Sequence, residues 1–387
     1  MQSLAGIRIL DLSRLLPGPY ATQWLADLGA EVIKVERPPE GDATRWMPPF
    51  MTLDAERFEG AIFWRNNRGK QSVVLDFFDA RGRAILLRLC EQADALVESF
   101  RPGVMAQRGL DYESVRARNP RLIYCSLSGY GQSGPYRDRA GHDLNYLALA
   151  GILKLNGASA TAPVLAPVQI ADLAGGMSAA LQISAALVER ERTGVGKFLD
   201  VALFDAAVDW MQTVLGACFR AENENPTRGA MPLTGAYPCY NLYETADGEY
   251  MALGALEPKF WRAFCDGIAR ADLLERQFDA DCIAVCAEIF KTRARAEWIV
   301  FAAQTDCCLE PLLAVSETLT HPQVMARGLA HGAGDAPRLG QDTRAVLTAR
   351  RRAGRIAGGR RAWRSARPNH LTERDLRRAI LEFFIRQ

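Results

Sequence analysis

Residues 8–36 read RILDLSRLLPGPYATQWLADLGAEVIKVE, and three segments of this stretch predict a β-α-β unit. The apolar run over 8–13 is expected to be a buried strand that ends before the turn signal PGP at 17–19. Residues 20–28 show helical spacing of apolar side chains and stop at a glycine, and residues 30–36 form the next strand. A crossover of this length joins parallel strands, so the sequence predicts a parallel sheet.

The same alternation continues along the first half of the chain. We expect further strands over 72–77, 95–100 and 122–128, and helices over 80–93 and 104–108. Alternating elements of this kind predict an α/β fold, with a large domain built on a Rossmann-like, mostly parallel sheet. The first turn lacks a G-x-G-x-x-G motif and the chain has no G-x-x-x-x-G-K-[ST] motif, so neither a dinucleotide nor an NTP site has motif support.

The domain organisation follows from shifts in composition. Two apolar helices, over 176–190 and 201–219, are expected to bridge the large domain and a smaller α+β domain. The predicted boundaries are 1–221 for the large α/β domain, 222–242 for a polar linker, 243–322 for the small domain, and 323–387 for a return to the large domain that ends in an Arg-rich tail.

Composition excludes several classes of protein. The 387 residues exceed the size at which one core usually stops growing, and 49% hydrophobic with 24% charged residues is typical of a globular protein. A net charge of +2 argues against nucleic acid as a partner. Nine cysteines without a CxxC pair favour free thiols in a reducing cytoplasm. Without a run of about 18 apolar residues or a signal peptide, we expect a cytoplasmic protein with no membrane partner.

The C-terminal segment differs from the rest of the chain. Residues 350–378 contain eleven arginines and two acidic residues. Such a segment is either a solvated basic face or a surface for an anionic partner such as nucleic acid. Residues 372–385 have the spacing of an amphipathic helix, so we expect the tail to be ordered and to dock on the body of the protein.

Two residues stand out as candidates for chemistry. His142 lies in the segment GHDLNY at 141–146, which predicts a loop-to-helix entry with an accessible ring, although a lone histidine is more often structural. Asp172 precedes the pair Gly175-Gly176 at the start of an apolar helix. It is either a helix N-cap or a carboxylate with room for a ligand, able to act as proton shuttle or nucleophile. No metal-ligand spacing is present.

A succession of motifs carries a family resemblance. These are LAGIRILDLS at 4–13, DLGAEVIKVE at 27–36, RNNRGK at 65–70, ESFRPG at 98–103 and GYGQSGP at 129–135. Over about residues 4–347, the chain resembles the class III CoA-transferase (CaiB/BaiF) family. The resemblance implies an α/β large domain, a smaller second domain and an intertwined homodimer. The interval over 325–340 is shorter than is usual in the family, and the ending after 347 departs from it.

Within the family, the motifs are most similar to those of the α-methylacyl-CoA racemases. The segment at 141–146 and GALEPKFW at 254–261 match the racemase pattern, and His142 precedes Asp172 by the spacing of that pattern. Racemases use this pair as a two-base proton shuttle, so the resemblance implies epimerisation at the α-carbon of 2-methylacyl-CoA thioesters, a reaction of lipid metabolism. Glu257 is implied as a supporting carboxylate. The alternative is a transferase that moves CoA between carboxylic acids through an aspartyl acyl-enzyme at Asp172.

The resemblance also implies how the substrate is held. Acyl-CoA is itself the substrate, and no cofactor or metal is required. The residues expected to bind CoA are Arg37, Arg68, Lys70, Arg101, Tyr130, Gly131, Asn145 and Tyr146. Each basic residue in this set, taken alone, is equally well a solvated surface charge.

Overall fold

The computed structural model describes residues 2–54, 57–159, 161–220, 226–329 and 335–349. These residues form two compact units. Within them, unit 1 covers positions up to 146, 169–210 and 335–349, and unit 2 covers 147–168 and 211–329. The boundaries of the units thus differ from the predicted domain boundaries, because 147–168 and 211–220 go with the second unit. The tail over 350–387 and its expected helix lie outside the described residues.

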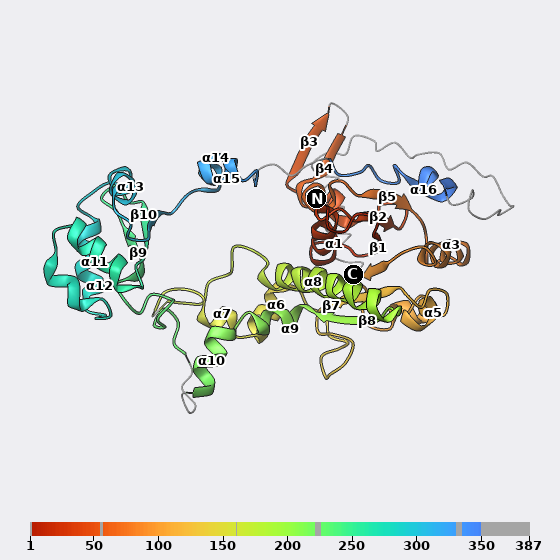
Figure 1. The fold of residues 1–387 in the computed structure, drawn as a ribbon, viewed down its shortest axis with the longest axis horizontal. Helices are drawn as coiled ribbons and strands as arrows, with labels where there is room; N and C mark the ends of the chain where they lie inside the picture. The colour runs from red at the N-terminus through yellow and green to blue at the C-terminus, as the bar shows by residue number, and fades with distance from the viewer. Residues whose placement is uncertain (1, 55–56, 160, 221–225, 330–334, 350–387) are drawn as a thin grey trace. The chain divides into compact units, whose positions relative to one another are not determined.

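Unit 1 is built on a six-stranded sheet whose neighbouring strands are all parallel (Figure 1). The order across the sheet is β5-β2-β1-β6-β7-β8. This confirms the predicted α/β fold with a parallel sheet. The strands are β1 (Arg8–Asp11), β2 (Glu31–Glu36), β5 (Gln71–Val74), β6 (Ala95–Glu98), β7 (Ile123–Ser128) and β8 (Phe198–Ala202).

The opening β-α-β unit forms as the sequence predicts, with small shifts at its ends. Ile9 of β1 pairs with Val32 of β2 and, on its other side, with the first residue of β6. These side chains are buried, as expected for an apolar run at the centre of a parallel sheet. Helix α1 (Pro17–Asp27) begins earlier than predicted, because proline suits the first turn of a helix.

Helices and a hairpin surround the sheet of unit 1. A core of apolar side chains packs between the sheet and the segments that contain α3 to α5. The remaining elements of the unit are η1 (Ala43–Trp46), β3 (Phe50–Asp54), β4 (Arg57–Gly60), α2 (Ala61–Asn67), α3 (Ala80–Cys90), α4 (Val104–Gln107), α5 (Tyr112–Arg116), α6 (Asp143–Leu149, which runs into unit 2), α8 (Ile170–Thr193), α9 (Leu203–Asp209) and α16 (Thr343–Ala349).

Helix α8 is a core helix of unit 1 and packs against α1 and α9 (Figure 1). By length and composition it could span a membrane, but half of its apolar window is buried within the protein. A Cβ atom at Gly175 would lie 2.4 Å from Leu203, and one at Gly176 would lie 2.6 Å from the carbonyl oxygen of Pro17. The two glycines therefore permit close helix packing. The expectation that they make room for a ligand is wrong.

The helix predicted over 201–219 is confirmed only in part, because its first two residues are extended and the helix is broken at 210–211. Residues 198–202 are the edge strand β8, which pairs with β7, and only then does α9 begin. A second helix, α10 (Gln212–Arg220), follows after a break at Trp210 and belongs to unit 2. Short apolar runs fit a strand as well as a helix, and the parallel partner strand decides between them.

Unit 2 contains a three-stranded antiparallel sheet with the order β11-β10-β9. Aromatic side chains and buried thiols fill its core, including Trp261, Phe264 and Trp298. All nine cysteines lie within the described residues and are free thiols, as expected. Its elements are α7 (Ile152–Leu155), β9 (Tyr240–Glu244), β10 (Tyr250–Gly254), α11 (Pro258–Gly267), η2 (Ala271–Arg276), α12 (Cys282–Phe290), α13 (Arg295–Gln304), β11 (Leu309–Pro311), α14 (Val315–Thr320) and α15 (Pro322–Ala326), in addition to α10.

Candidate active site

The carboxyl ends of β1 and β6 lie where the strand order of the sheet changes direction. From β1 the chain continues to β2 on one side, whereas β6 and β7 extend the sheet on the other side. Arg14 follows β1 and Ser99 follows β6, and the Arg14 amide donates a hydrogen bond to Ser99 Oγ at 3.0 Å. Ligands of open α/β sheets bind in the crevice at such a point. A functional site is therefore expected at this edge.

A carboxylate from α6 caps the first turn of α8. Asp143 Oδ1 accepts hydrogen bonds from the backbone N–H of Ala171 at 2.7 Å and of Asp172 at 3.2 Å. These groups need an outside partner, because the first N–H groups of a helix have none within it. Gln169, the N-cap residue of α8, makes no capping hydrogen bond through its side chain. Asp143 therefore ties the start of α6, which follows His142 directly, to the start of α8.

Asp172 is the third residue of α8, so its interpretation as the N-cap is wrong. The capping role belongs to Asp143 instead. The Asp172 side chain is partly buried, and this burial, together with the negative charge of Asp143, raises its pKa to about 7. A carboxyl group with such a pKa can both accept and donate a proton near neutral pH.

His142 is exposed and directly precedes α6. Asn145 fixes the turn through two hydrogen bonds. Its side-chain Oδ1 accepts from the backbone N–H of His142 at 3.0 Å, and its backbone N–H donates to the His142 carbonyl at 2.8 Å. The predicted loop-to-helix entry with an accessible residue is confirmed. Asn145 uses its side-chain oxygen in this turn, so the structure gives it a local structural role. Its contact with CoA stays a prediction.

Tyr146 is buried and supports the loop that carries His142. Its hydroxyl donates to the carbonyl of Gly141 at 2.6 Å. A Cβ atom at Gly129 would lie 2.4 Å from that hydroxyl, and one at Gly141 would lie 2.8 Å from the ring, so both glycines allow the ring to pack. Burial, and then the charge of Asp172, raises the pKa of Tyr146. Tyr146 is thus near Asp172. Because its hydroxyl already donates its hydrogen to the Gly141 carbonyl, it has no hydrogen left to donate to CoA.

Tyr130 and Gly131 follow β7 at the same edge of the sheet. The Tyr130 ring is half-buried, with its centroid 5.1 Å from that of Tyr146 and 5.9 Å from that of Phe204. Gly131 has a φ of +83°, in the region that favours glycine. The structure therefore brings these two predicted CoA-binding residues next to the loop that carries His142.

The predicted CoA-binding arginines differ in how far they are engaged within the protein. Arg101 follows β6, is exposed, and its positive charge acts on Tyr146. Arg37 follows β2 and is partly exposed, with Nε 3.1 Å from Asp76 Oδ1. Arg68 is 11% exposed and donates to Asp27 Oδ2 at 2.7 Å. Arg37 and Arg101 thus remain accessible at the carboxyl edge of the sheet, whereas Arg68 is largely occupied.

Lys70 lies in a buried polar network and not at a ligand surface. Its ammonium donates to Asp11 Oδ2 at 3.1 Å, Thr22 Oγ1 at 2.7 Å, Asn67 Oδ1 at 3.0 Å and the Pro19 carbonyl at 2.9 Å. Its side chain has no exposed area, and burial lowers its pKa to about 8. The prediction that Lys70 binds CoA phosphates therefore needs correction. The residue stabilises the interior of unit 1.

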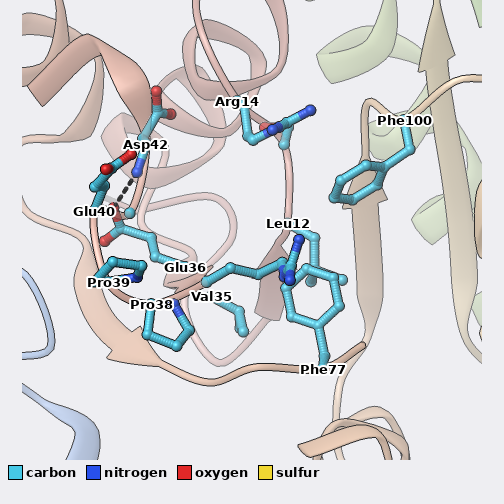
Figure 2. Close-up of a pocket in the computed structure, with 13 residues that line it drawn as sticks. Leu12, Arg14, Val35, Glu36, Pro38, Pro39, Glu40, Asp42, Phe77 and Phe100 are labelled. Atoms are coloured by element: carbon cyan, nitrogen blue, oxygen red, sulfur yellow. Dashed lines mark hydrogen bonds between the residues drawn. The ribbon is translucent and has the colours of Figure 1, made fainter. Parts of the chain in front are cut away.

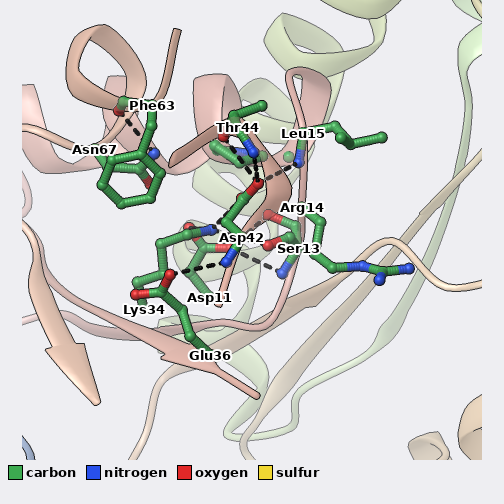
Figure 3. Close-up of polar contacts among 12 residues, drawn as sticks. Asp11, Ser13, Arg14, Leu15, Lys34, Glu36, Asp42, Thr44, Phe63 and Asn67 are labelled. Atoms are coloured by element: carbon green, nitrogen blue, oxygen red, sulfur yellow. Dashed lines mark hydrogen bonds and ion pairs between the residues drawn. The ribbon is translucent and has the colours of Figure 1, made fainter. Parts of the chain in front are cut away.

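The network continues through Lys34 to the loop after β1 (Figure 3). Lys34 Nζ lies 3.1 Å from Asp42 Oδ2 and donates to the Ser13 carbonyl at 2.9 Å. Burial alone would raise the pKa of Asp11. The positive charges of Lys34 and Lys70 outweigh this effect, so the pKa of the Asp11 carboxyl is lowered. The paired charges thus hold the Ser13–Arg14 turn in place.

Replacing Lys70 with methionine is expected to lower the stability of the protein strongly. The change leaves buried acceptors without a donor, and breaking a buried ion pair costs about 3–5 kcal/mol. Urea unfolding measures the change, with Lys197→Met as control, because the Lys197–Glu189 pair is exposed and worth no more than about 1 kcal/mol. Wild-type stability combined with lost CoA binding in Lys70→Met would instead support the phosphate-binding prediction.

A pocket of about 150 Å³ opens beside this network, at the carboxyl ends of β1 and β2 (Figure 2). Burial and the like charge of Arg37 lower the pKa of Arg14, while Asp42 raises it. Three carboxyl groups line the pocket beside the two guanidinium groups, but Glu36 is paired with Arg45 and Asp42 with Lys34. The guanidinium groups of the lining are therefore the groups that suit an anionic ligand. The sequence did not single out Arg14, although its position directly after the first strand was a usable signal. The lining consists of Leu12, Ser13, Arg14, Val35, Glu36, Arg37, Pro38, Pro39, Glu40, Gly41, Asp42, Phe77 and Phe100.

Glu257, the third predicted catalytic residue, belongs to unit 2. It is exposed and directly precedes α11, whose first residue is a proline. Its participation in the chemistry stays a prediction. Among the described residues, there is no group of three or more His, Cys, Asp and Glu side chains arranged to hold a metal ion.

Comparison with known proteins identifies the class to which this fold and site belong. The model of CoA-transferase family III matches residues 4–359, past the point where the resemblance was expected to end. Human alpha-methylacyl-CoA racemase is 38% identical over 332 residues, which cover 84% of this chain and 82% of the racemase. Succinate–glutarate CoA-transferase of Agrobacterium fabrum is 36% identical over 344 residues, 84% of each chain.

Solved structures agree with the sequence comparison. A CAIB/BAIF family protein from Brucella suis has a TM-score of 0.79 at 31% identity, over 89% of this chain and 98% of that protein. The chain therefore belongs to CoA-transferase family III and is an enzyme of this group of transferases and racemases. The predicted family is confirmed. Racemase and transferase relatives have similar identities, so the chain is equally close to both kinds of enzyme.

Proposed function

We propose that the enzyme epimerises the α-carbon of 2-methylacyl-CoA thioesters by two-base proton transfer. A thioester acidifies its α-proton only modestly, so its removal near neutral pH needs a positioned base and stabilisation of the resulting enolate. His142 and Asp172 on opposite faces of the α-carbon would each act as the base in one direction and as the acid in the other. The enolate forms when one group takes the proton, and the other group protonates the opposite face.

The hydrogen bonds from Ala171 and Asp172 to Asp143 are the observation that carries this proposal. They tie the segment that directly follows His142 to the helix turn that carries Asp172. The pKa of about 7 at Asp172 suits a group that must be both base and acid at one pH. The amino end of the 24-residue helix α8 adds positive potential, which favours the negative charge of an enolate.

The accessible arginines at the carboxyl edge of the sheet support an acyl-CoA substrate. CoA carries phosphate groups, and guanidinium groups bind phosphates through several hydrogen bonds at once. Arg14 and Arg37 line one pocket, and Arg101 follows β6 close to Tyr146. These three arginines, unlike Lys70, are available to a bound anion. CoA is the substrate in this proposal, and the reaction needs no further cofactor.

The alternative function is CoA transfer between carboxylic acids. In this reaction the Asp172 carboxylate attacks the thioester carbonyl, and CoA leaves as the thiolate to give a mixed anhydride. The thiolate then attacks the aspartyl carbonyl, which gives an aspartyl-CoA thioester and releases the donor carboxylate. The acceptor carboxylate repeats these steps in reverse, leaves as its CoA thioester and restores Asp172. The 36% identity to succinate–glutarate CoA-transferase favours this possibility. A nucleophile needs an ionised carboxylate, which a pKa of about 7 provides for only part of the molecules at neutral pH.

The proposal includes an intertwined homodimer that acts in lipid metabolism in the cytoplasm. Large apolar side chains that are exposed on α1, at its C-cap and on α8 support a second copy as their cover. These side chains are Trp24, Leu28, Met177, Leu181 and Val188.

The two reactions are distinguished by parallel assays on the full chain. In one, a single stereoisomer of a 2-methylacyl-CoA is incubated with the enzyme, and the loss of optical purity is followed. In the other, acyl-CoA donors are mixed with free carboxylates, and new thioesters are sought. Racemisation without transfer supports the proposal. Transfer without racemisation, with an acyl-enzyme at Asp172 that hydroxylamine captures, supports the alternative.

Replacing Asp143 with asparagine is expected to lower the pKa of Asp172. Asparagine keeps an oxygen for the two helix N–H groups but removes the negative charge that disfavours ionisation of Asp172. Because Asp172 acts as a base when ionised, the acidic limb of the kcat/KM profile should move to lower pH. An unchanged limb, or one moved to higher pH, would contradict this account of the electrostatics.

A further inference from the structure

Glu98 is a buried carboxyl group that the proposed proton transfers do not use. It is the last residue of β6 and is 4% exposed. Its Oε2 accepts a hydrogen bond from the Phe100 amide at 2.8 Å, and its Oε1 accepts one from the hydroxyl of Ser126 on β7. The carboxyl group therefore joins two neighbouring strands at the edge of the sheet where the candidate site lies.

The hydrogen bonds extend from Glu98 into the loop after β7. Gln132 Nε2 donates to Ser126 Oγ at 2.9 Å, and the Ser126 hydroxyl donates in turn to Glu98. At one end of this chain, Phe100 directly precedes Arg101. At the other end, Gln132 directly follows Gly131. One carboxyl group thus connects the two loops that carry Arg101 and the Tyr130–Gly131 pair.

Burying this carboxyl group is costly, which argues for a specific role. Burial raises the pKa of Glu98 to about 7, and the hydrogen bonds from Ser126 and the Phe100 amide offset that rise only in part. An apolar residue of similar size would fill the same space without this cost. It could not, however, accept the two hydrogen bonds that orient the loops.

We propose that Glu98 is a positioning residue that holds the loops carrying Arg101 and Tyr130–Gly131 in the geometry that binds CoA. This inference rests on the proposed CoA-binding function. Glu98 itself touches no substrate, and it acts through the Phe100 amide on one loop and through Ser126 and Gln132 on the other.

Three variants of the full chain test the two branches separately. Glu98→Ala removes both branches, Ser126→Ala removes only the branch to Gln132, and Glu98→Gln keeps an acceptor for the Phe100 amide and a polar partner for Ser126. Calorimetry measures the affinity for CoA. Hydrogen–deuterium exchange of the peptides 99–103 and 129–137 measures loop order, with a peptide from α1 as the internal control for folding.

Glu98→Ala is expected to weaken CoA binding about tenfold, the loss typical of one hydrogen bond to a charged group, and to speed exchange in both loop peptides. Ser126→Ala should speed exchange only in 129–137. Glu98→Gln should bind CoA within about twofold of the wild type. If Glu98→Ala folds, unchanged CoA affinity and unchanged hydrogen–deuterium exchange would overturn the proposal. If it does not fold, unchanged exchange of peptide 129–137 in Ser126→Ala would overturn it. A wild-type chain that fails to bind CoA would instead reject the proposed function.

Discussion

Replacing Asp172 with asparagine is expected to lower kcat for the proposed epimerisation by about 10²–10⁴, the usual contribution of a positioned acid–base group. The carboxamide has nearly the shape of the carboxyl group but cannot take up the α-proton near neutral pH. The Asp172 backbone amide still donates to Asp143, so the first turn of α8 should persist. Chiral analysis of the product at saturating substrate measures the effect, and calorimetry with CoA should show affinity within about twofold of the wild type.

Asp111→Asn is the matched control for Asp172→Asn. Asp111 also lies at a helix start, where its carboxylate caps α5 by accepting from the Ser114 amide at 3.0 Å. Asparagine is an equally good N-cap, so stability and activity should both stay near wild-type values. Full epimerase activity in Asp172→Asn would remove this residue from the chemistry. Equal losses in both variants would point to a general effect on folding.

Replacing His142 with alanine is expected to lower kcat for epimerisation strongly while CoA binding survives. In the proposed mechanism the imidazole is one of the two bases, and the change removes only atoms beyond Cβ of an exposed residue. The Asn145 hydrogen bonds involve the backbone of His142 and remain available. The expected loss of kcat is again about 10²–10⁴. Epimerisation assays and CoA titrations on the same preparation separate a chemical effect from a binding effect.

His321→Ala is the control for the histidine variant. His321 is likewise exposed and lies at a helix start, but it belongs to unit 2, where its ring accepts from the Gln323 amide at 3.3 Å. Its removal should cost a little stability and leave turnover unchanged. A His142→Ala enzyme that racemises at the wild-type rate would exclude the two-base mechanism, and one that loses CoA binding would make His142 a binding residue.

Local patterns predicted the sheet of unit 1 because its strands are short apolar runs separated by turn signals. The edge strand β8 was missed because it lacks these two features. Phe198 and Asp200 are exposed there, and the apolar end of the strand continues without a turn signal into α9. Only the pairing with β7 reveals that residues 198–202 are extended. With a single polar residue, FLDVA at 198–202 shows no clear alternation, and a short apolar run does not separate a strand from the start of a helix.

The candidate site was harder to predict from the sequence than the sheet, because it is built from contacts between residues far apart in the chain. His142 and Asp172 could be selected from their motifs, but the Asp143 side chain that links their segments reaches the start of a helix 28 residues further on. Lys70 shows the same limit. The family resemblance implied that Lys70 binds CoA, and taken alone it was equally well a solvated surface charge. Its partners Asp11 and Thr22, however, lie 59 and 48 residues away and enclose it in the core. Burial of a charged residue depends on partners that only the fold brings together.

Deuterium exchange by the two single-base variants tests the central claim most directly. Each variant is incubated in D2O with each stereoisomer of a 2-methylacyl-CoA, and deuterium at the α-carbon is measured before any inversion. If His142 and Asp172 serve opposite faces, His142→Ala and Asp172→Asn should each exchange only one stereoisomer, and not the same one, while inverting neither. Exchange of the same stereoisomer by both variants, or of both stereoisomers by either, would contradict the two-base account.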